Sequence, residues 1–492
     1  MAEAYIVAAT RTAGGRKGGR LRDWHPADLG AVVLNELVDR TGIDPAVIED
    51  VVMGCVMQVG EQATNVARGA VLASRLPESV PATSVDRQCG SSQQALHFAA
   101  QAVMSGTMDV VIASGVESMT RVPMGLSVAL PAKEGFGNPM SPNQQKRYPN
   151  IQFSQFMGAE MMAEKYGLTK DQLDEFAYGS HQRAIAATQA GAFKDEIVAV
   201  DGRDGKGDEG NAVRHDSDEG IRYDSSLDAI KGVKLLREGG AITAATSSQI
   251  CDGASGVMVV SEKALKEYGL TPLARIHHLT LIGHDPVIML EAPLPATERA
   301  LKKTGMSIDD IDIFEVNEAF ASVPVAWLKT TGADPAKMNV NGGAIALGHP
   351  LGASGVMVVS EKALKEYGLT PLARIHHLTL IGHDPVIMLE APLPATERAL
   401  KKTGMSIDDI DIFEVNEAFA SVPVAWLKTT GADPAKMNVN GGAIALGHPL
   451  GASGTKLMTT LVHALKARNK KWGLQTMCEG GGLANVTIIE RL

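Results

Sequence analysis

The chain has 492 residues, of which 45% are hydrophobic and 4% aromatic, and its formal net charge is −10. This length is enough for two or more cores, built mainly from aliphatic side chains. The negative charge argues against nucleic acid or an anionic membrane as a partner, so a phosphate-bearing ligand would need a local basic patch.

The four cysteines are too few for a disulfide framework in a chain of this length, which favours a reducing compartment. None of them has the Cys-x-x-Cys spacing of a metal site, and we predict no bound metal. No apolar run reaches the roughly 18 residues of a membrane span, and the N-terminus lacks the apolar core of a signal peptide. We therefore expect a cytoplasmic protein.

Strands and helices alternate through the first 119 residues, and this order predicts a parallel sheet. We expect strands at residues 5–10, 50–56 and 109–114, and helices at residues 28–41 and 89–105. The last of these strands is a continuous apolar run, which is typical of a strand buried on both faces.

Residues 120–248 are rich in Pro, Gly, Asn and charge clusters, and they predict an inserted, loop-rich subdomain with a few helices, such as one at 167–188. The α/β pattern then returns, with a strand at 257–260, a helix at 262–268 and a strand at 274–282.

A long segment of the chain is written twice. From Gly253 to Gly355 every residue is identical to the residue 99 positions later, which gives a first copy at 253–351 and a second copy at 352–450. The copies are longer than the units of about 20–50 residues in repeat proteins, and they show no drift at surface positions. We interpret the repeat as a recent tandem duplication or as an assembly or cloning error, with a functional double domain as the alternative.

Two cysteines lie in unusual surroundings. Cys89 follows a strand and a glycine-containing turn at the start of a helix, whose free N–H groups and partial positive charge favour a thiolate of lowered pKa. This predicts a nucleophile, against the alternative of a buried, inert cysteine. Cys478 precedes three glycines, which suit a loop that passes close to a substrate, against the alternative of a simple turn.

Each copy also carries a histidine between glycine and proline just before a helix, at His349 and His448. A histidine in this position can accept a thiol proton or donate to an oxyanion. An Asn-Glu-Ala-Phe segment follows a predicted buried strand in each copy and supplies an amide, at Asn317 and Asn416.

Together, these elements resemble the thiolase family, which comprises acetyl-CoA acetyltransferases and 3-ketoacyl-CoA thiolases. The nucleophile helix, the Asn-Glu-Ala-Phe segment, the Gly-His-Pro loop and the terminal Cys-x-Gly-Gly loop occur in family order, over essentially the whole chain once one copy is set aside. The resemblance implies an α/β fold of αβαβα layers, with two similar halves that each contain a five-stranded mixed sheet. A loop domain inserted in the first half would bind coenzyme A.

The resemblance also implies an acyltransferase. It would carry out reversible thiolysis of 3-ketoacyl-CoA, or the condensation of two acyl-CoAs, through an acyl group on Cys89. His448, or its duplicate His349, would activate Cys89. Cys478 would move the proton at the α-carbon of acetyl-CoA.

Two oxyanions need stabilisation in such a reaction. By resemblance, the backbone N–H groups of Cys89 and Gly480 would hold one of them. The histidine, with a water held by Asn416 or by its duplicate Asn317, would hold the other. Coenzyme A is a substrate in this scheme, and no covalently bound cofactor is expected.

Two residues match family positions that contact coenzyme A, Arg222 near the adenine and Ser248 at the pantetheine. Short-chain thiolases typically have His-Met-Gly where this chain has Phe156 before Met157 and a glycine. We therefore place Met157 in the substrate site and expect longer or bulkier 3-ketoacyl groups. The family further suggests a homodimer or a homotetramer.

We predict five segments along the chain. They are the N-terminal half (1–119), the loop domain that binds coenzyme A (120–248), the last strand of the N-terminal half (249–268), a spare duplicated segment (269–365) and the C-terminal half (366–492). The second copy should complete the C-terminal half, because it runs without interruption into the tail, and this makes His448 the catalytic histidine. The spare segment lacks its usual partners, so we expect it to be disordered or molten.

Two other functions are considered. A ketoacyl synthase or hydroxymethylglutaryl-CoA synthase has the same fold, but ketoacyl synthases typically use Cys-His-His, so Cys478 and Asn416 favour a thiolase. The second alternative is a catalytically inactive, acyl-CoA-binding protein on a thiolase scaffold.

Overall fold

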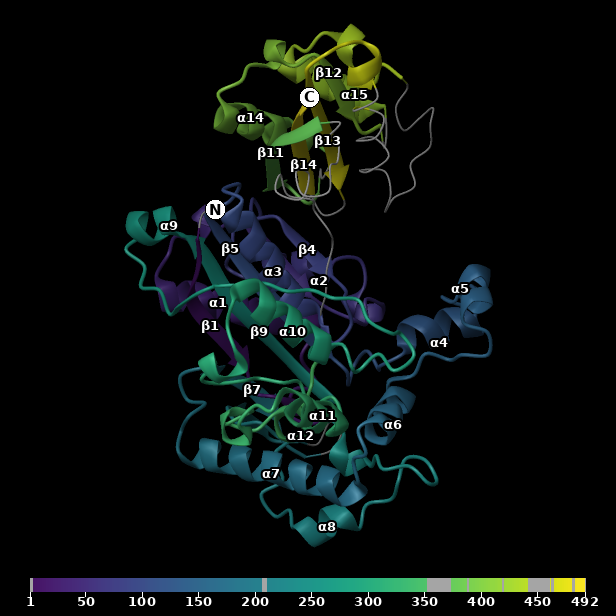
Figure 1. The fold of residues 1–492 in the computed structure, drawn as a ribbon. Helices are drawn as coiled ribbons and strands as arrows, with labels where there is room; N and C mark the ends of the chain where they lie inside the picture. The colour runs from purple at the N-terminus through teal and green to yellow at the C-terminus, as the bar shows by residue number, and fades with distance from the viewer. Residues whose placement is uncertain are drawn as a thin grey trace.

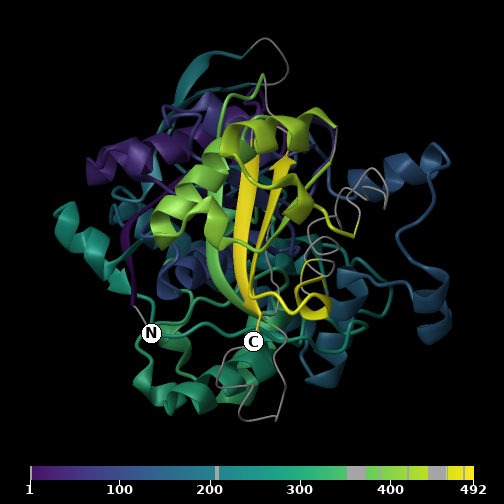
Figure 2. The same cartoon turned by 90° about the horizontal axis from the view of Figure 1, so that it is seen from above.

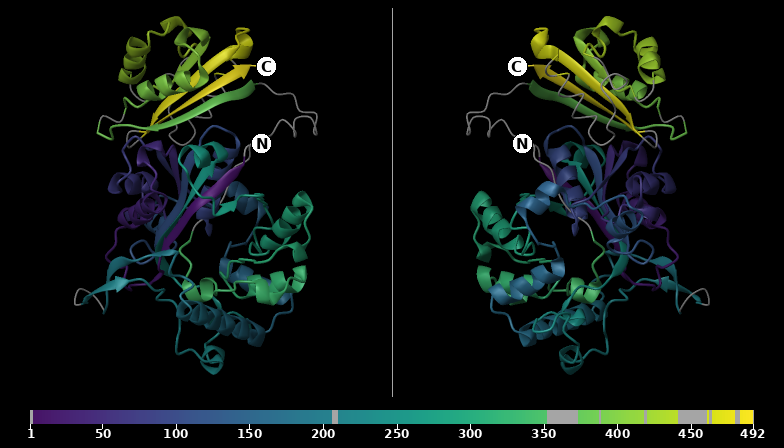
Figure 3. Two further views of the ribbon diagram at one scale, coloured as in Figure 1. Left: turned by 90° about the vertical axis from the view of Figure 1, so that its left-hand side faces the viewer. Right: turned by 90° about the vertical axis from the view of Figure 1, so that its right-hand side faces the viewer.

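The computed structural model describes most of the chain. The described stretches are residues 3–205, 210–351, 373–386, 389–417, 420–440, 461, 464–479 and 483–491. Figure 1 shows the C-terminal strands at one end of the molecule, the N-terminal sheet in the middle and the loop domain at the opposite end. Views from above and from both sides show the C-terminal strands lying over the N-terminal sheet (Figures 2 and 3).

The N-terminal sheet is mixed. Its strands are β1 (Ala4–Thr12), β2 (Gly15–Arg16), β3 (Asp50–Gly54), β4 (Ala82–Val85), β5 (Val110–Ser118), β6 (Ile197–Val198), β9 (Cys251–Ser261) and β10 (Ala274–Arg275). The main path runs β10-β1-β9-β5-β3-β4. Strands β3, β4 and β5 are parallel as predicted, whereas β9 is antiparallel to β1 and β5. The predicted parallel order therefore holds for β3, β4 and β5 but not for the whole sheet, because β9 returns from the loop domain and inserts antiparallel between β1 and β5.

Helices cover both faces of this sheet. They are α1 (Pro26–Thr41), α2 (Val66–Ala73) and α3 (Ser91–Met104). Along β5, Val110 and Ile112 join the core that contains α1 and α2, while Val111 and Ala113 join the core on the side of α3. Because successive side chains point to opposite faces, the apolar run of β5 holds one helical layer on each side.

The loop domain contains several helices and one hairpin. They are α4 (Leu126–Lys133), α5 (Pro142–Arg147), α6 (Gln155–Lys165), α7 (Lys170–Gln189), α8 (Leu227–Lys231), β7 (Val200–Arg203) and β8 (Ala212–His215). Helix α7 begins near its predicted position because Thr169 and Gln172 form a capping box there. Helices α4 and α5 project from the body in Figure 1. No helix in the described stretches combines the length and the apolarity needed to cross a lipid bilayer.

The first copy packs against the loop domain. Its helices are α9 (Glu262–Glu267), α10 (Pro293–Thr304), α11 (Ser322–Thr331) and α12 (Ala344–Leu347). Phe320 and Ala326 share a hydrophobic core with Met162 of α6 and Leu173 of α7. The sequence predicts a spare segment at 269–365 that lacks packing partners. Up to residue 351 the structure differs from this prediction, because α6 and α7 provide an apolar surface for the first copy.

The second copy and the tail form the C-terminal sheet. The elements are β11 (Ala373–Gly382), α14 (Pro392–Thr403), β12 (Ile412–Val415), α15 (Ser421–Thr430), β13 (Trp472–Glu479) and β14 (Leu483–Arg491). Their strand order is β11-β14-β13-β12, in which only the β12–β13 pair is parallel. Ala395 of α14 shares a core with Phe413, Trp426 and Ile488, so this helix covers one face of the sheet.

Identical sequences take different structures in the two copies. Ile412 lies in β12 and is 2% exposed, whereas Ile313, its counterpart in the first copy, is 60% exposed. The first-copy segment keeps only an isolated bridge between Phe314 and Met338. The difference arises because β13, the partner of β12, occurs once in the chain.

We predict that Ile412→Ala lowers the free energy of unfolding by about 2–5 kcal/mol, because it leaves a cavity in the core of the C-terminal sheet. The matched variant Ile313→Ala should change that free energy by less than about 0.5 kcal/mol, since the side chain is largely exposed. Urea denaturation of both variants beside the unmodified chain measures the two effects. Equal losses would contradict the assignment of the C-terminal sheet to the second copy.

Candidate active site

Cys89 lies in a constrained turn at the start of a helix. The residue before it, Gln88, has a φ of +57°, a conformation that is uncommon outside glycine. Helix α3 begins at Ser91 and rests very close to the sheet: a Cβ on Gly54 would come within 2.3 Å of the backbone nitrogen of Ser92. The strained turn and the close approach of the helix together fix the position of the Cys89 backbone.

The Cys89 thiol resists ionisation. Its pKa is raised to about 11, chiefly by burial and further by the carboxylates of Glu117 and Asp86, while a backbone hydrogen bond acts in the opposite direction. The lowered pKa predicted from the helix N-terminus is therefore wrong, because α3 begins two residues later and the sulfur is desolvated near two carboxylates. Cys89 is a thiol at neutral pH, so chemistry at its sulfur requires a base.

Glu117 is a buried carboxylate near this sulfur. It accepts hydrogen bonds from the backbone N–H groups of Val56 at 2.9 Å and Met57 at 3.2 Å, and from the side-chain amide of Gln62 at 2.6 Å. Burial raises the pKa of Glu117 although these hydrogen bonds favour its charged form. The carboxylate thus holds the loop after β3 in place beside Cys89.

The first copy brings its histidine and its asparagine together. Nδ2 of Asn317 lies 3.5 Å from Nε2 of His349. The imidazole is half-buried, and burial lowers its pKa to about 4. The ring is neutral at neutral pH, with one nitrogen able to accept a proton and the other able to donate.

A buried glutamate anchors this part of the first copy to the loop domain. Glu318 accepts hydrogen bonds from Oγ of Ser180 at 2.7 Å, Nδ2 of Asn339 at 2.8 Å and the backbone N–H of Ile345 at 3.2 Å. A Cβ on Gly343 would come within 2.2 Å of the carboxylate, so the chain can approach Glu318 this closely only as glycine. Since Ser180 belongs to α7, which occurs once, only one copy can be anchored in this way.

One cavity lies between the start of α3, which follows Cys89, and the loop that contains His349. It has a volume of about 340 Å³. Ser92 at the start of α3 lines one side, and Gly348 and Pro350, which flank His349, line another. A ligand in this cavity would lie between the start of α3 and the His349 loop of the first copy.

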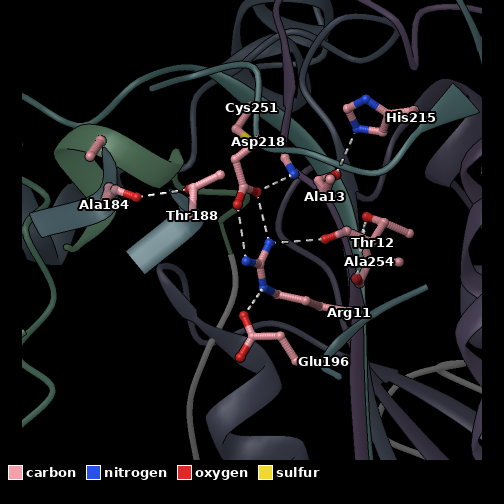
Figure 4. Close-up of polar contacts among 12 residues, drawn as sticks. Arg11, Thr12, Ala13, Ala184, Thr188, Glu196, His215, Asp218, Cys251 and Ala254 are labelled. Atoms are coloured by element: carbon pink, nitrogen blue, oxygen red, sulfur yellow. Dashed lines mark hydrogen bonds and ion pairs between the residues drawn. The ribbon is translucent and has the colours of Figure 1, made fainter. Parts of the chain in front are cut away.

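An ion-paired network forms a further wall of the cavity (Figure 4). The guanidinium of Arg11 donates to both carboxylate oxygens of Asp218, at 2.7 and 3.0 Å, and to Glu196 at 2.7 Å. Asp218 also accepts the backbone N–H of Gly14 at 2.7 Å. Burial opposes the charge of Arg11, but the carboxylates outweigh it and raise its pKa. Because this guanidinium is bound to two carboxylates, it ties β1 to the loop domain.

The residues matched to coenzyme A contacts lie where the loop domain meets the first copy. The backbone N–H of Ser248 donates to the carbonyl of Ala319 at 3.0 Å, two residues after Asn317. Arg222 is exposed, and its Nη2 lies 3.5 Å from Oε1 of Gln249. The structure therefore gathers Arg222, Ser248 and Asn317 along one junction.

An apolar surface adjoins this junction. The ring of Phe156 meets that of Phe320 edge to face, with centroids 5.6 Å apart. Phe156 and Met157 are both partly exposed at the start of α6. They are available to contact an acyl group or a pantetheine chain.

Other predicted residues lie elsewhere. Cys478 is buried in the core of the C-terminal sheet, and Asn416 is buried at the end of β12. His448 and Gly480 lie outside the described residues. Within the stretches that the structure describes, no three His, Cys, Asp or Glu side chains gather as a metal site would require.

Several residues that hold the site were not singled out from the sequence: Glu117, Glu318 and Gln249. Glu318 lies in the Asn-Glu-Ala-Phe motif, so its type and position were a usable signal. Its function as an anchor depends on Ser180, which is 138 residues away in the chain. Contacts over such separations leave no periodic pattern in a single sequence.

Two family models match this chain. The model "Thiolase, N-terminal domain" matches residues 4–263. The model "Thiolase, C-terminal domain" matches twice, at residues 270–366 and at residues 369–491. The two C-terminal matches correspond to the first copy and to the second copy with the tail.

Individual proteins are similar over most of their length. The chain is 42% identical over 494 residues to the steroid 3-ketoacyl-CoA thiolase FadA6 of Mycobacterium tuberculosis, covering 100% of this chain and 95% of that protein. It is 42% identical over 365 residues to a 3-ketoacyl-CoA thiolase of Yersinia pestis, covering 73% of this chain and 91% of that protein. The crystal structure of human mitochondrial 3-ketoacyl-CoA thiolase matches with a TM-score of 0.63 and 27% identity, over 100% of this chain and 99% of that one.

We predict that alkylation of Cys89 by iodoacetamide accelerates about tenfold per pH unit between pH 7 and pH 10, because only the thiolate reacts and its pKa is about 11. Glu117→Gln should raise the rate at each pH, since it removes a negative charge that disfavours the thiolate. Mass spectrometry of the Cys89 peptide measures the rate, with Glu267→Gln as the control at an exposed carboxylate. A rate that levels off below pH 8 would contradict the raised pKa.

Proposed function

The chain belongs to the thiolase family of acyltransferases, and on this premise we propose that it uses the cavity at the start of α3 to cleave 3-ketoacyl-CoA with coenzyme A. The same site would condense two acyl-CoAs in the reverse direction. The observation that carries the proposal is that one cavity is lined by Ser92, three residues after Cys89, and by Gly348 and Pro350, which flank His349. Coenzyme A is a substrate in this reaction, and the scheme requires no resident cofactor.

In thiolysis, Cys89 first has to lose its proton. The neutral ring of His349 accepts that proton as the sulfur attacks the 3-keto carbon of the substrate. The bond between C2 and C3 then breaks, and the acyl group remains on Cys89 as a thioester. The electron pair left on C2 takes a proton, and acetyl-CoA leaves. We propose Cys478 as the proton donor, which requires its thiol to reach the cavity from the core of the C-terminal sheet.

The second half of the reaction regenerates the enzyme. The thiol of coenzyme A gives its proton to the Cys478 thiolate and attacks the thioester, so the acyl group moves to coenzyme A. Cys89 leaves as a thiolate and takes its proton back from His349. We propose that the N–H groups of Cys89 and Gly480 hold the oxyanion on the acyl carbon. His349, with a water held by Asn317, would hold the enolate oxygen of acetyl-CoA.

We propose that the first copy supplies the catalytic histidine. Asn317 lies against His349, and Glu318 binds Ser180 of the loop domain. This differs from the choice of His448 made from chain continuity alone. Continuity governs which copy joins the tail, whereas the contacts with the loop domain govern which copy lines the cavity.

For the substrate, we propose a 3-ketoacyl-CoA with a long or bulky acyl group. Arg222 and Ser248 would bind coenzyme A along the junction between the loop domain and the first copy. Phe156 and Met157 present a partly exposed apolar surface there. A relative of this chain is named a steroid 3-ketoacyl-CoA thiolase, which supports a bulky group.

The assembly state and the compartment remain predictions: a homodimer or homotetramer, in the cytoplasm. The alternative of a related condensing enzyme is disfavoured by the presence of Cys478 and of the Asn-Glu-Ala-Phe segment. The alternative of an inactive acyl-CoA-binding protein is decided by the activity measurement below.

We predict that the full chain cleaves 3-ketoacyl-CoA in the presence of coenzyme A and that Cys89→Ala abolishes the activity, because the acyl group then has no acceptor. The value of kcat/KM should be higher for a ring-bearing 3-ketoacyl-CoA than for acetoacetyl-CoA. A spectrophotometric assay follows the loss of the enolate form of the substrate. Acetoacetyl-CoA as the best substrate would contradict the bulky acyl group, and a folded but inactive chain would contradict the enzyme itself. Activity restored by deleting residues 253–351 would attribute that inactivity to the duplication.

We predict different effects for the two matched histidine variants. His349→Ala should lower kcat by about 10²–10⁴-fold, the usual contribution of a general base, whereas His448→Ala should leave kcat within about twofold. Steady-state kinetics of both variants, each checked for folding by circular dichroism, measures the contrast. The reverse pattern would assign the site to the second copy.

A further inference from the structure

Gln249 occupies a central place at the junction between the loop domain and the first copy. It lies between Ser248 and the start of β9, outside the repeated segment, so it occurs once. Its side chain is half-buried. Neither a catalytic motif nor the proposed contacts with coenzyme A include it.

The side-chain amide of Gln249 joins two separate segments. Its Nε2 donates to the carbonyl of Gly220 at 2.7 Å and to the carbonyl of Ile345 at 2.8 Å. A primary amide has two N–H donors, so both are used. The backbone carbonyl of Gln249 also accepts a hydrogen bond from the N–H of His349 at 3.2 Å. This is the third hydrogen bond of Gln249, and it is made to the histidine itself.

The two joined segments are also in direct contact. A Cβ on Gly220 would come within 2.6 Å of the carbonyl oxygen of Ala346. Two residues after Gly220, the N–H of Arg222 donates to Nδ1 of His181 on α7 at 3.3 Å. The segment at 220–222 is thus fixed to the loop domain, and the histidine loop is fixed to that segment.

From these contacts we propose that Gln249 is a positioning residue, which holds the loop of His349 against the segment that carries Arg222. This rests on the proposed function, in which His349 is the base and Arg222 binds coenzyme A. Gln249 touches neither substrate nor reacting atoms in this proposal. It acts by fixing where the imidazole lies relative to the cavity.

The chemistry of the amide explains why glutamine is suited to this position. Glutamate has the same shape, but its carboxylate would face two carbonyl oxygens that need donors, and methionine has a similar length without any donor. In both variants the carbonyls of Gly220 and Ile345 lose their partner, and unpaired carbonyls favour separation of the two segments. Glutamate should have the larger effect, because it adds repulsion.

The test compares Gln249→Met and Gln249→Glu with Gln145→Glu, which makes the same charge change on the projecting helix α5 (Figure 1). We expect kcat to fall about tenfold in Gln249→Met and further in Gln249→Glu, as expected when about two hydrogen bonds that align a base are lost. The control should match the unmodified chain.

A second readout follows the histidine itself. We expect the pKa of His349 to rise from about 4 toward the ordinary value of about 6.5 in both Gln249 variants, because the freed loop exposes the ring to water. Titration of the ring Cε1–H signal by NMR measures it, with the signal assigned by its loss in His349→Ala. This readout does not require activity, so it tests the position of the loop even if the proposed function fails.

The possible outcomes separate clearly. A lower melting temperature with kcat and the His349 titration unchanged would show a merely structural residue and overturn the proposal. An unchanged titration in Gln249→Glu would overturn it as well. If Gln249→Glu does not fold, the milder Gln249→Met decides, and its His349 titration must shift for the proposal to stand.

Discussion

The rest of the structure depends on one constraint: two identical copies compete for partners that occur once. Strand β13 can pair with only one copy of the Ile-Phe-Glu-Val strand, and the second copy has it. Ser180 can bind only one copy of the motif glutamate, and the first copy has it. The chain therefore divides one C-terminal half between two copies, with the sheet built by one and the cavity lined by the other.

The comparison of the two copies separates structure that forms locally from structure that needs a partner far away in the chain. Helices α10 and α14 both start at proline and end at a left-handed glycine. In both copies the tryptophan donates to a threonine of that helix at 2.9 Å, as in the pair Trp327–Thr297. These contacts are made within 30 residues and persist in either setting. Strand formation does not persist, because unpaired backbone N–H and C=O groups are left to water when no neighbouring strand is available.

The same distinction explains what could be predicted from the sequence. The buried strand β5, the helix α7 and the position of Cys89 between strand and helix depend on local patterns, and all three were predicted. The position of the first copy could not be predicted, because its sequence is identical to that of the second. The raised pKa of Cys89 was also missed, since it arises chiefly from burial of the sulfur and further from Glu117, and both depend on how distant segments pack.

Electrostatics favour a resting state in which neither the thiol of Cys89 nor the imidazole of His349, the groups of the proposed reaction, carries a charge. A thiol with a pKa of about 11 and an imidazole with a pKa of about 4 both remain neutral at pH 7, so the thiolate–imidazolium pair is the less stable form. Burial is the principal cause of both shifts, and it acts in the direction that disfavours each charged form. In the proposed mechanism, proton transfer therefore becomes favourable only as the sulfur forms its bond to the acyl carbon and the negative charge moves to the carbonyl oxygen. On that proposal the placement of the imidazole matters more than its basicity, so the contacts that hold the histidine loop are as important to the chemistry as the histidine.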